Sequence, residues 1–270
     1  MIYVNPVPAE FASGEYYDQV AAEYYLSPDK LESDYADVRF QRELRFFRNY
    51  CLRGTVLDVG CSSGAFLFQL KRRFSQDYQV LGTDVSGPPL AYAESRGIPI
   101  VRGSFLDMTP GERKFDAITF WAVLEHVAEP RLFVEKAAAL LNPGGFCFVL
   151  VPNMKSLAVR LLASRYRYIY PQHLNYFTAS TLKQLVEKEF VVLDLRSMHF
   201  NPMVIWQDWR RRGVAVSNKE RGELLKRTTA YKQNPMLRPA KTLYQIAENL
   251  LGVFGLADNL AVGLQKRGSR

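Results

Sequence analysis

The chain has 270 residues, 48% of them hydrophobic and 23% charged, which is enough for one α/β domain with an added segment and a buried core. It contains no run of about eighteen apolar residues and no basic N-terminal stretch followed by an apolar one, so we expect neither a membrane span nor export. Its three cysteines, Cys51, Cys61 and Cys147, show no metal-binding or pairing pattern, which predicts a reducing, cytoplasmic setting.

The net charge of +8 is concentrated near the C-terminus. Residues 201–270 contain 13 Lys and Arg against 5 Asp and Glu, whereas the first 200 residues contain 22 of each kind. A basic excess in one segment is typical of a local anionic partner, and a solvated helical face explains it equally well.

The first 50 residues are rich in tyrosine and charge. A basic stretch at residues 38–50 is predicted to be a helix, and the tyrosines before it are expected mainly to pack this segment on the rest of the protein. These tyrosines are Tyr16, Tyr17, Tyr24, Tyr25 and Tyr35.

From residue 55 to residue 196, apolar runs alternate with stretches of helical periodicity. This alternation is typical of a parallel sheet with helices on both faces. One helix is predicted to begin at Pro130 and to end at the Pro143-Gly144-Gly145 sequence. The six predicted strands are residues 55–59, 79–84, 98–102, 115–121, 145–152 and 190–198.

A seventh strand is predicted at residues 259–266, where Leu260, Val262 and Leu264 alternate with smaller or polar residues. Between the sixth and seventh strands, the sequence predicts three helices, at residues 206–212, 218–231 and 239–251. An insertion of this length with its own helices is typical of a functional element. We therefore divide the chain into an N-terminal helical segment (1–50), a core (51–199), a basic helical insertion (200–257) and the final strand with its tail (258–270).

The turn after the first predicted strand indicates a cofactor that contains a nucleotide. Gly60 and Gly64 bracket this turn, and Asp84 ends the neighbouring strand, where an acidic side chain can meet ribose hydroxyls. The turn lacks the G-x-G-x-x-G pattern of nicotinamide and flavin sites, and it lacks the Walker pattern. Asp58, just before the turn, disfavours a pyrophosphate and favours a cationic ligand that carries an amino acid.

With these residues the chain resembles the class I S-adenosylmethionine-dependent methyltransferases, whose first motif reads acid-x-G-x-G-x-G. Ser62 stands where that family usually has glycine. The resemblance implies an α/β, Rossmann-like, doubly wound sheet of seven strands, mostly parallel, with an antiparallel last strand beside the sixth. It also implies that the N-terminal segment packs as a lid over S-adenosylmethionine, which is converted to S-adenosylhomocysteine.

The resemblance further implies the residues of the cofactor site. Asp58, Gly60 and Gly64 would line the methionine moiety, Asp84 would hold the ribose, and Asp107 would face the adenine amino group. Aromatic faces attract a sulfonium cation, and Tyr16, Tyr24 and Trp121 are the candidates. The full predicted cofactor site is Asp58, Gly60, Cys61, Gly64, Asp84, Val85, Phe105, Leu106, Asp107, Trp121, Tyr16 and Tyr24.

Methyl transfer to a hydroxyl group requires a proton acceptor, and His126 and His173 are the candidates. His126 follows the fourth predicted strand in a Leu-Glu-His-Val motif that resembles the ubiquinone-type O-methyltransferases, where the motif is associated with a divalent metal. Those proteins have another acid three residues before the glutamate. Ala122 stands at that position here, so we predict no bound metal.

His173 lies in a His-Leu-x-Tyr-Phe element that resembles a subgroup found in bacterial sugar, surface-polysaccharide and natural-product pathways. The loop is expected over the methyl group, with His173 as base or substrate clamp and His126 as second candidate. A structural role, such as a bond to a backbone carbonyl, is the alternative for both histidines.

The predicted acceptor is a small molecule, anionic or carrier-linked, such as a sugar or a natural-product intermediate, because arginines border the expected cleft. The Arg210-Arg211-Arg212 run is part of this argument. The predicted acceptor-binding residues are Asn153, Arg165, Arg167, Tyr176 and Arg210.

Three other functions also fit the sequence. N-methylation of an amino sugar is close to O-methylation, because nothing in the sequence identifies the nucleophile. An RNA methyltransferase fits the basic C-terminal part, but we find no appended RNA-binding module and no Asn-Pro-Pro-Tyr-like motif. A non-catalytic adaptor is the third alternative, since the apolar face of residues 243–256 suits an anionic membrane surface or a homodimer contact, with packing inside the insertion as the simpler expectation.

Overall fold

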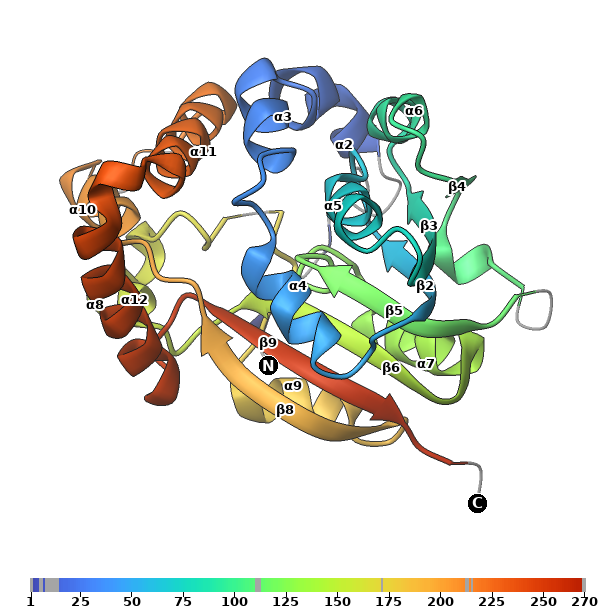
Figure 1. Cartoon of the computed structure of the whole chain (residues 1–270). Helices are drawn as coiled ribbons and strands as arrows, with labels where there is room; N and C mark the ends of the chain where they lie inside the picture. The colour runs from blue at the N-terminus through green and yellow to red at the C-terminus, as the bar shows by residue number, and fades with distance from the viewer. Residues whose placement is uncertain are drawn as a thin grey trace.

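A seven-stranded sheet forms the centre of the protein in a computed structural model that describes residues 2–4, 7, 15–109, 113–170, 172–211, 214 and 216–268 (Figure 1). The strands from β2 to β6 run parallel, and β9 is antiparallel to both of its neighbours. The predicted doubly wound, mostly parallel sheet with an antiparallel last strand is therefore confirmed. In spatial order the strands are β4 (Ile100–Arg102), β3 (Tyr78–Asp84), β2 (Gly54–Val59), β5 (Phe115–Trp121), β6 (Leu141–Pro152), β9 (Asn259–Lys266) and β8 (Phe190–Met198).

Alternation along the strands builds a core on each face of the sheet. In β2, Val56 points into a cluster with Phe66 of α5 (Ala65–Arg73), whereas Leu57 points into a second cluster with Val134 of α7 (Pro130–Leu140). Both β2 side chains are fully buried, as expected for a strand covered by helices on both sides. The first face also carries α6 (Gly87–Ser95), and the second carries α9 (Ala179–Val186).

Strand β6 begins earlier than its glycines suggest. The predicted start was residue 145, but Leu141 already pairs with Phe115 of β5, and the register then shifts so that Phe146 pairs with Ala117. Gly144 takes a left-handed φ of 72°, which lets the chain absorb the extra residues without leaving the sheet.

The N-terminal segment has two parts with different surroundings. The helix α4 (Gln41–Arg48) inserts Phe46 and Phe47 beside Phe148 of β6, so it belongs to the core packing. Ahead of it, the chain forms α2 (Glu15–Val20), a π-helical turn η1 (Ala21–Tyr25) and α3 (Pro28–Asp34). A short strand, β1 (Ile2–Tyr3), pairs with β7 (Asn175–Tyr176).

The three predicted helices of the insertion are present with shifted bounds. They are α10 (Pro202–Arg211), α11 (Asn218–Gln233) and α12 (Arg238–Val253), and Arg212 lies outside the described residues. Figure 1 shows α11 next to α3, and Lys226 of α11 lies 2.9 Å from Asp29 and 3.0 Å from Glu32. The insertion and the N-terminal segment therefore meet above the sheet.

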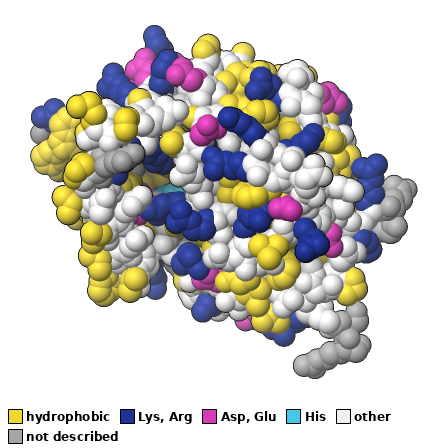
Figure 2. Space-filling view, in the orientation of Figure 1, with side chains coloured by type: hydrophobic (Ala, Val, Ile, Leu, Met, Phe, Trp, Pro, Cys, Tyr) yellow, Lys and Arg dark blue, Asp and Glu magenta, His cyan; other side chains and the backbone are white. Residues whose placement is uncertain are grey.

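The apolar face of α12 is exposed, which differs from the expected packing inside the insertion. Leu243 and Leu250 are 70% and 55% exposed, and Phe254 just after the helix is 72% exposed. Figure 2 shows hydrophobic side chains along the edge of the molecule where α10 and α12 lie. Among the described residues, no helix is both long and apolar enough to span a membrane.

Candidate active site

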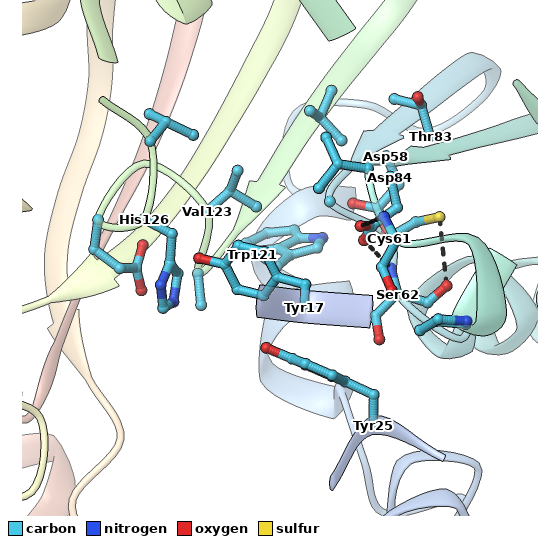
Figure 3. A pocket seen from close by; sticks show the side chains of 18 of the residues that line it. Tyr17, Tyr25, Asp58, Cys61, Ser62, Thr83, Asp84, Trp121, Val123 and His126 are labelled. Atoms are coloured by element: carbon cyan, nitrogen blue, oxygen red, sulfur yellow. Dashed lines mark hydrogen bonds between the residues drawn. The ribbon is translucent and has the colours of Figure 1, made fainter. Parts of the chain in front are cut away.

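A cavity of about 580 Å³ opens at the carboxyl ends of β2, β3 and β5. The order of the sheet reverses at β2, and clefts in doubly wound folds form at this point. Figure 3 shows two ends of the cavity: Cys61, Ser62 and Asp84 lie at one end and His126 at the other, with Trp121 and Tyr17 between them. We call them the acidic end and the histidine end.

The turn at the acidic end depends on left-handed backbone at Gly60, Ser62 and Gly64, with φ of 68°, 50° and 76°. A Cβ at Gly60 would lie 2.6 Å from Val123, so this glycine is required for close packing. A Cβ at Gly64 would lie 2.9 Å from Ala93, and Gly64 serves helix packing and does not line the cavity.

Asp84 ties this turn to the end of β3. Its carboxylate accepts hydrogen bonds from the backbone N–H of Ser62 at 2.8 Å and of Ser86 at 3.0 Å. Burial raises its pKa, and these hydrogen bonds partly offset that effect. The hydroxyl of Ser62 is buried without a partner among the described residues, so the serine that departs from the motif offers a free polar group to a ligand.

Asp58 is a second buried carboxylate at this end. Burial raises its pKa to about 7, while a 2.6 Å hydrogen bond from the Thr119 hydroxyl acts in the opposite direction and the nearby Asp84 adds to the rise. A cationic group placed in the cavity would favour the ionised form. Thr119 has no sequence signal of its own, because it comes from a strand 61 residues away.

The other predicted cofactor residues divide into two groups. Cys61, Val85, Phe105, Leu106, Trp121 and Tyr24 line the cavity. Asp107 and Tyr16 do not line it: Asp107 ends the short helix η2 (Phe105–Asp107), and the hydroxyl of Tyr16 accepts a 2.6 Å hydrogen bond from Gln172.

The histidine end brings His126 and His173 together, with ring centroids 4.7 Å apart. Nδ1 of His126 lies 2.9 Å from the carbonyl oxygen of Gln172, and Nδ1 of His173 lies 2.7 Å from that of Tyr168. A carbonyl only accepts, so both Nδ1 atoms are protonated and both Nε2 atoms keep a lone pair. Burial lowers the pKa of His126 to about 4 and that of His173 well below its usual range, so both rings are neutral at pH 7.

Glu125 completes this end of the cavity. It is buried, its Oε2 has no partner among the described residues, and burial raises its pKa to about 8. Ligand atoms of Glu125, His126 and His173 all lie within 4.8 Å of one another, so this set could hold a metal ion. We predicted no metal because Ala122 replaces an acid of the related motif. Ala122 lines the cavity and offers no ligand atom, but His173 adds one from a distant part of the chain. The sequence did not reveal that His173 joins Glu125 and His126.

The predicted acceptor-binding residues lie elsewhere, and none of the five lines the cavity. The amide of Asn153 donates to the carbonyls of Gly255 and Ala257, each at 2.9 Å, in agreement with a turn role. Arg167 is buried against Asp208 of α10, and this ion pair joins the insertion to the loop after β6.

The remaining three also make contacts within the protein or end an outer helix. Tyr176 donates to the carbonyl of Tyr170 at 3.1 Å, Arg165 ends the short helix η3 (Ala163–Arg165), and Arg210 lies over the Trp206 ring at 4.2 Å. Sequence reasoning missed several residues that do line the cavity: Tyr17, Tyr25, Ser62, Glu125, Tyr168, Tyr170 and Arg221.

Comparison with known proteins agrees with this fold. The profile of a family described as a methyltransferase domain matches residues 34–189, which is more than half of the chain. The architecture is that of class I S-adenosylmethionine-dependent methyltransferases. This chain belongs to the methyltransferase-domain family.

Two curated relatives share one name. The ubiquinone biosynthesis O-methyltransferase of Nitrobacter winogradskyi is 32% identical over 167 residues, which cover 57% of this chain and 62% of the relative. That of Rhodopseudomonas palustris is 27% identical over 220 residues, which cover 73% of this chain and 85% of the relative. The chain thus spans less than two thirds of the length of the first relative.

Solved structures agree in fold alone. The N-methyltransferase NodS from Bradyrhizobium japonicum, in complex with S-adenosylhomocysteine, has a TM-score of 0.53 at 13% identity, over 92% of this chain and 97% of that one. The [4+2]-cyclase SpnF has a TM-score of 0.59 at 16% identity, over 98% and 99%. Since one neighbour is named for a cyclisation, the fold does not define the reaction.

The Asp84→Ala variant should bind S-adenosylmethionine and S-adenosylhomocysteine about 10- to 100-fold more weakly, because hydrogen bonds to a charged group contribute about 1.5–3 kcal/mol. Isothermal titration calorimetry measures both affinities. Asp77→Ala, just before the other end of β3, is the matched control and should bind normally. Wild-type affinity in folded Asp84→Ala would contradict the assignment.

The affinity for S-adenosylmethionine should rise between pH 6 and pH 8. The free protein holds a proton on Asp58 below its pKa of about 7, and a cationic ligand must displace that proton, so affinity falls as pH falls, by at most about tenfold per pH unit. Calorimetry in buffers of different ionisation enthalpy should show proton release on binding. Asp58→Asn should remove this release, and a pH-independent wild-type affinity would refute the role of Asp58.

Proposed function

We propose that this protein transfers the methyl group of S-adenosylmethionine to a hydroxyl group of a small molecule. The proposal depends on the observation that the acidic end and the two neutral histidines face the same cavity. The acidic end lies at the switch point of the sheet, and the histidines lie at the opposite end. The name of the curated relatives favours oxygen as the acceptor atom. We place the reaction in the cytoplasm, in keeping with three buried cysteines that are all free.

In the proposed reaction the acidic end binds the cofactor, with Asp84 toward the ribose and Asp58 toward the cationic methionine portion. The acceptor oxygen attacks the methyl carbon in line, the carbon–sulfur bond breaks, and neutral S-adenosylhomocysteine leaves. The hydroxyl proton passes to Nε2 of His173 or His126. Glu125 of the same cluster is protonated at pH 7, and its unpartnered oxygen can accept a hydrogen bond from the imidazolium that forms.

The acceptor in this proposal is a small hydroxylated molecule such as a sugar or a natural-product intermediate. Tyrosine rings and hydroxyls line the cavity, and they suit a ring that carries hydroxyl groups. The assay is transfer of a labelled methyl group from S-adenosylmethionine to a panel of hydroxylated acceptors and their amino counterparts. Transfer to the amino compounds alone would replace O-methylation with N-methylation.

His173→Asn should lower kcat by about 10²- to 10⁴-fold, the usual contribution of a general base, while the affinity for S-adenosylhomocysteine stays unchanged. Asparagine keeps an N–H close to the position of Nδ1, so the bond to the Tyr168 carbonyl can persist. His126→Asn is the paired variant, and the labelled-methyl assay compares the two. Normal turnover in His173→Asn would exclude this residue, and a loss confined to His126→Asn would transfer the role.

A peripheral contact with an anionic membrane is a second proposal, favoured by the exposed apolar face of α12 and by Trp206 and Trp209 of α10, which are 47% and 61% exposed beside Arg210. The protein should co-sediment with phosphatidylglycerol vesicles and not with phosphatidylcholine vesicles. Leu250→Glu should reduce binding, whereas Leu132→Glu, an exposed leucine of α7, should not. Failure of the wild type to co-sediment would remove this proposal.

A further inference from the structure

Some basic side chains of the cavity lining have a carboxylate partner, and one has none among the described residues. Lys30 and Arg39 both pair with the buried carboxylate of Asp34, and Nε of Arg39 lies 3.3 Å from it. Arg221 of α11 also lines the cavity, and none of the Asp and Glu residues that the structure describes is within ion-pair distance of it. Arg221 is therefore a cation in the wall that no carboxylate of the described protein compensates.

Two aromatic rings hold the Arg221 guanidinium. Its central carbon lies 4.9 Å from the ring centroid of Tyr24 and 5.2 Å from that of Tyr170, and one of its nitrogens donates to the Tyr170 hydroxyl at 3.4 Å. A guanidinium has five N–H donors in a planar fork, and ring faces occupy none of them. The arrangement thus orients the fork and leaves donors for a ligand.

Arg221 lies near the histidine end of the cavity. The Tyr170 ring that it contacts is also 4.3 Å, centroid to centroid, from His173. In addition to burial, the charge of Arg221 lowers the pKa of both His126 and His173. The position is therefore next to the proposed base, where an acceptor and not the cofactor would lie.

Helix α11 is anchored so that Arg221 keeps this position. Ser217 and Glu220 form a capping box at its start, and Lys226 joins it to the N-terminal segment through Asp29 and Glu32. Arg211, from the basic run that we had expected to bind the acceptor, instead pairs with Glu220. Among the described residues of the insertion, the basic side chain that lines the cavity is thus that of Arg221.

We propose that Arg221 binds a carboxylate group of the acceptor, so that the preferred substrate is a hydroxylated carboxylic acid; this rests on the methyl transfer proposed above. A single planar fork matches a carboxylate in bidentate fashion, and Arg221 itself has no carboxylate partner among the described residues. A phosphate dianion would require further donors, and the other basic side chains of the cavity wall are already paired with Asp34.

The test compares caffeate with methyl caffeate, which have the same ring hydroxyls and differ in one negative charge. Isothermal titration into protein saturated with S-adenosylhomocysteine should show caffeate binding at least about tenfold more tightly than the ester, the usual size of a hydrogen bond to a charged group. Arg221→Gln should abolish this preference, and Arg221→Lys should retain part of it. Arg227→Gln, which removes an exposed arginine of α11 that does not line the cavity, should keep the full preference.

Three results would overturn the assignment: equal affinity for acid and ester, a preference that survives in Arg221→Gln, or no binding of either compound. Inorganic phosphate that displaces caffeate and binds more tightly would reassign the site to a phosphorylated acceptor. Weaker binding of S-adenosylhomocysteine in Arg221→Gln, with the acid preference intact, would reassign Arg221 to the cofactor. A wild-type protein that binds no S-adenosylhomocysteine would instead reject the proposed function itself.

Discussion

The carboxylate of Asp84 is the constraint on which the acidic end of the cavity depends. By accepting from the backbone of both Ser62 and Ser86, it joins the turn after β2 to the turn after β3. These hydrogen bonds support left-handed backbone at a serine, which costs more than at a glycine. The join also brings Asp58 and Asp84 to one side of the cavity, where two buried carboxylates repel each other until a cation arrives.

The histidine end differs from the acidic end because its two imidazoles carry no charge. Burial keeps His126 and His173 neutral, and backbone carbonyls select the tautomer that leaves Nε2 free. Glu125 has an oxygen without a protein partner beside them. Unpaired buried polar atoms reduce folding stability, so their concentration in one cavity indicates a ligand or a reaction that uses them.

Of the described residues of the insertion, Arg221 lines the cavity, whereas many others lie at the surface. The basic composition of the insertion suggested a cluster of arginines for an anionic ligand, but Arg167 and Arg211 are already paired with Asp208 and Glu220. Charge counted along a sequence overstates what a ligand can meet, because ion pairs inside the protein consume part of it. Arg221 remains available to a ligand because its neighbours are the uncharged rings of Tyr24 and Tyr170 and the hydroxyl of Tyr170.

The sequence by itself determined the sheet, its order along the chain and the acidic end of the cavity. Those features depend on local periodicity and on short motifs, such as the glycine turn from Gly60 to Gly64 and the acid that ends β3, which neighbouring residues encode. Only the tertiary structure decided the histidine end and the position of Arg221 in the cavity lining. Glu125, His173 and Arg221 come from separate parts of the chain, and they line one cavity because the segment after β5, the loop before β7 and α11 all border it. Contacts between such distant segments leave no spacing pattern that a single sequence can reveal.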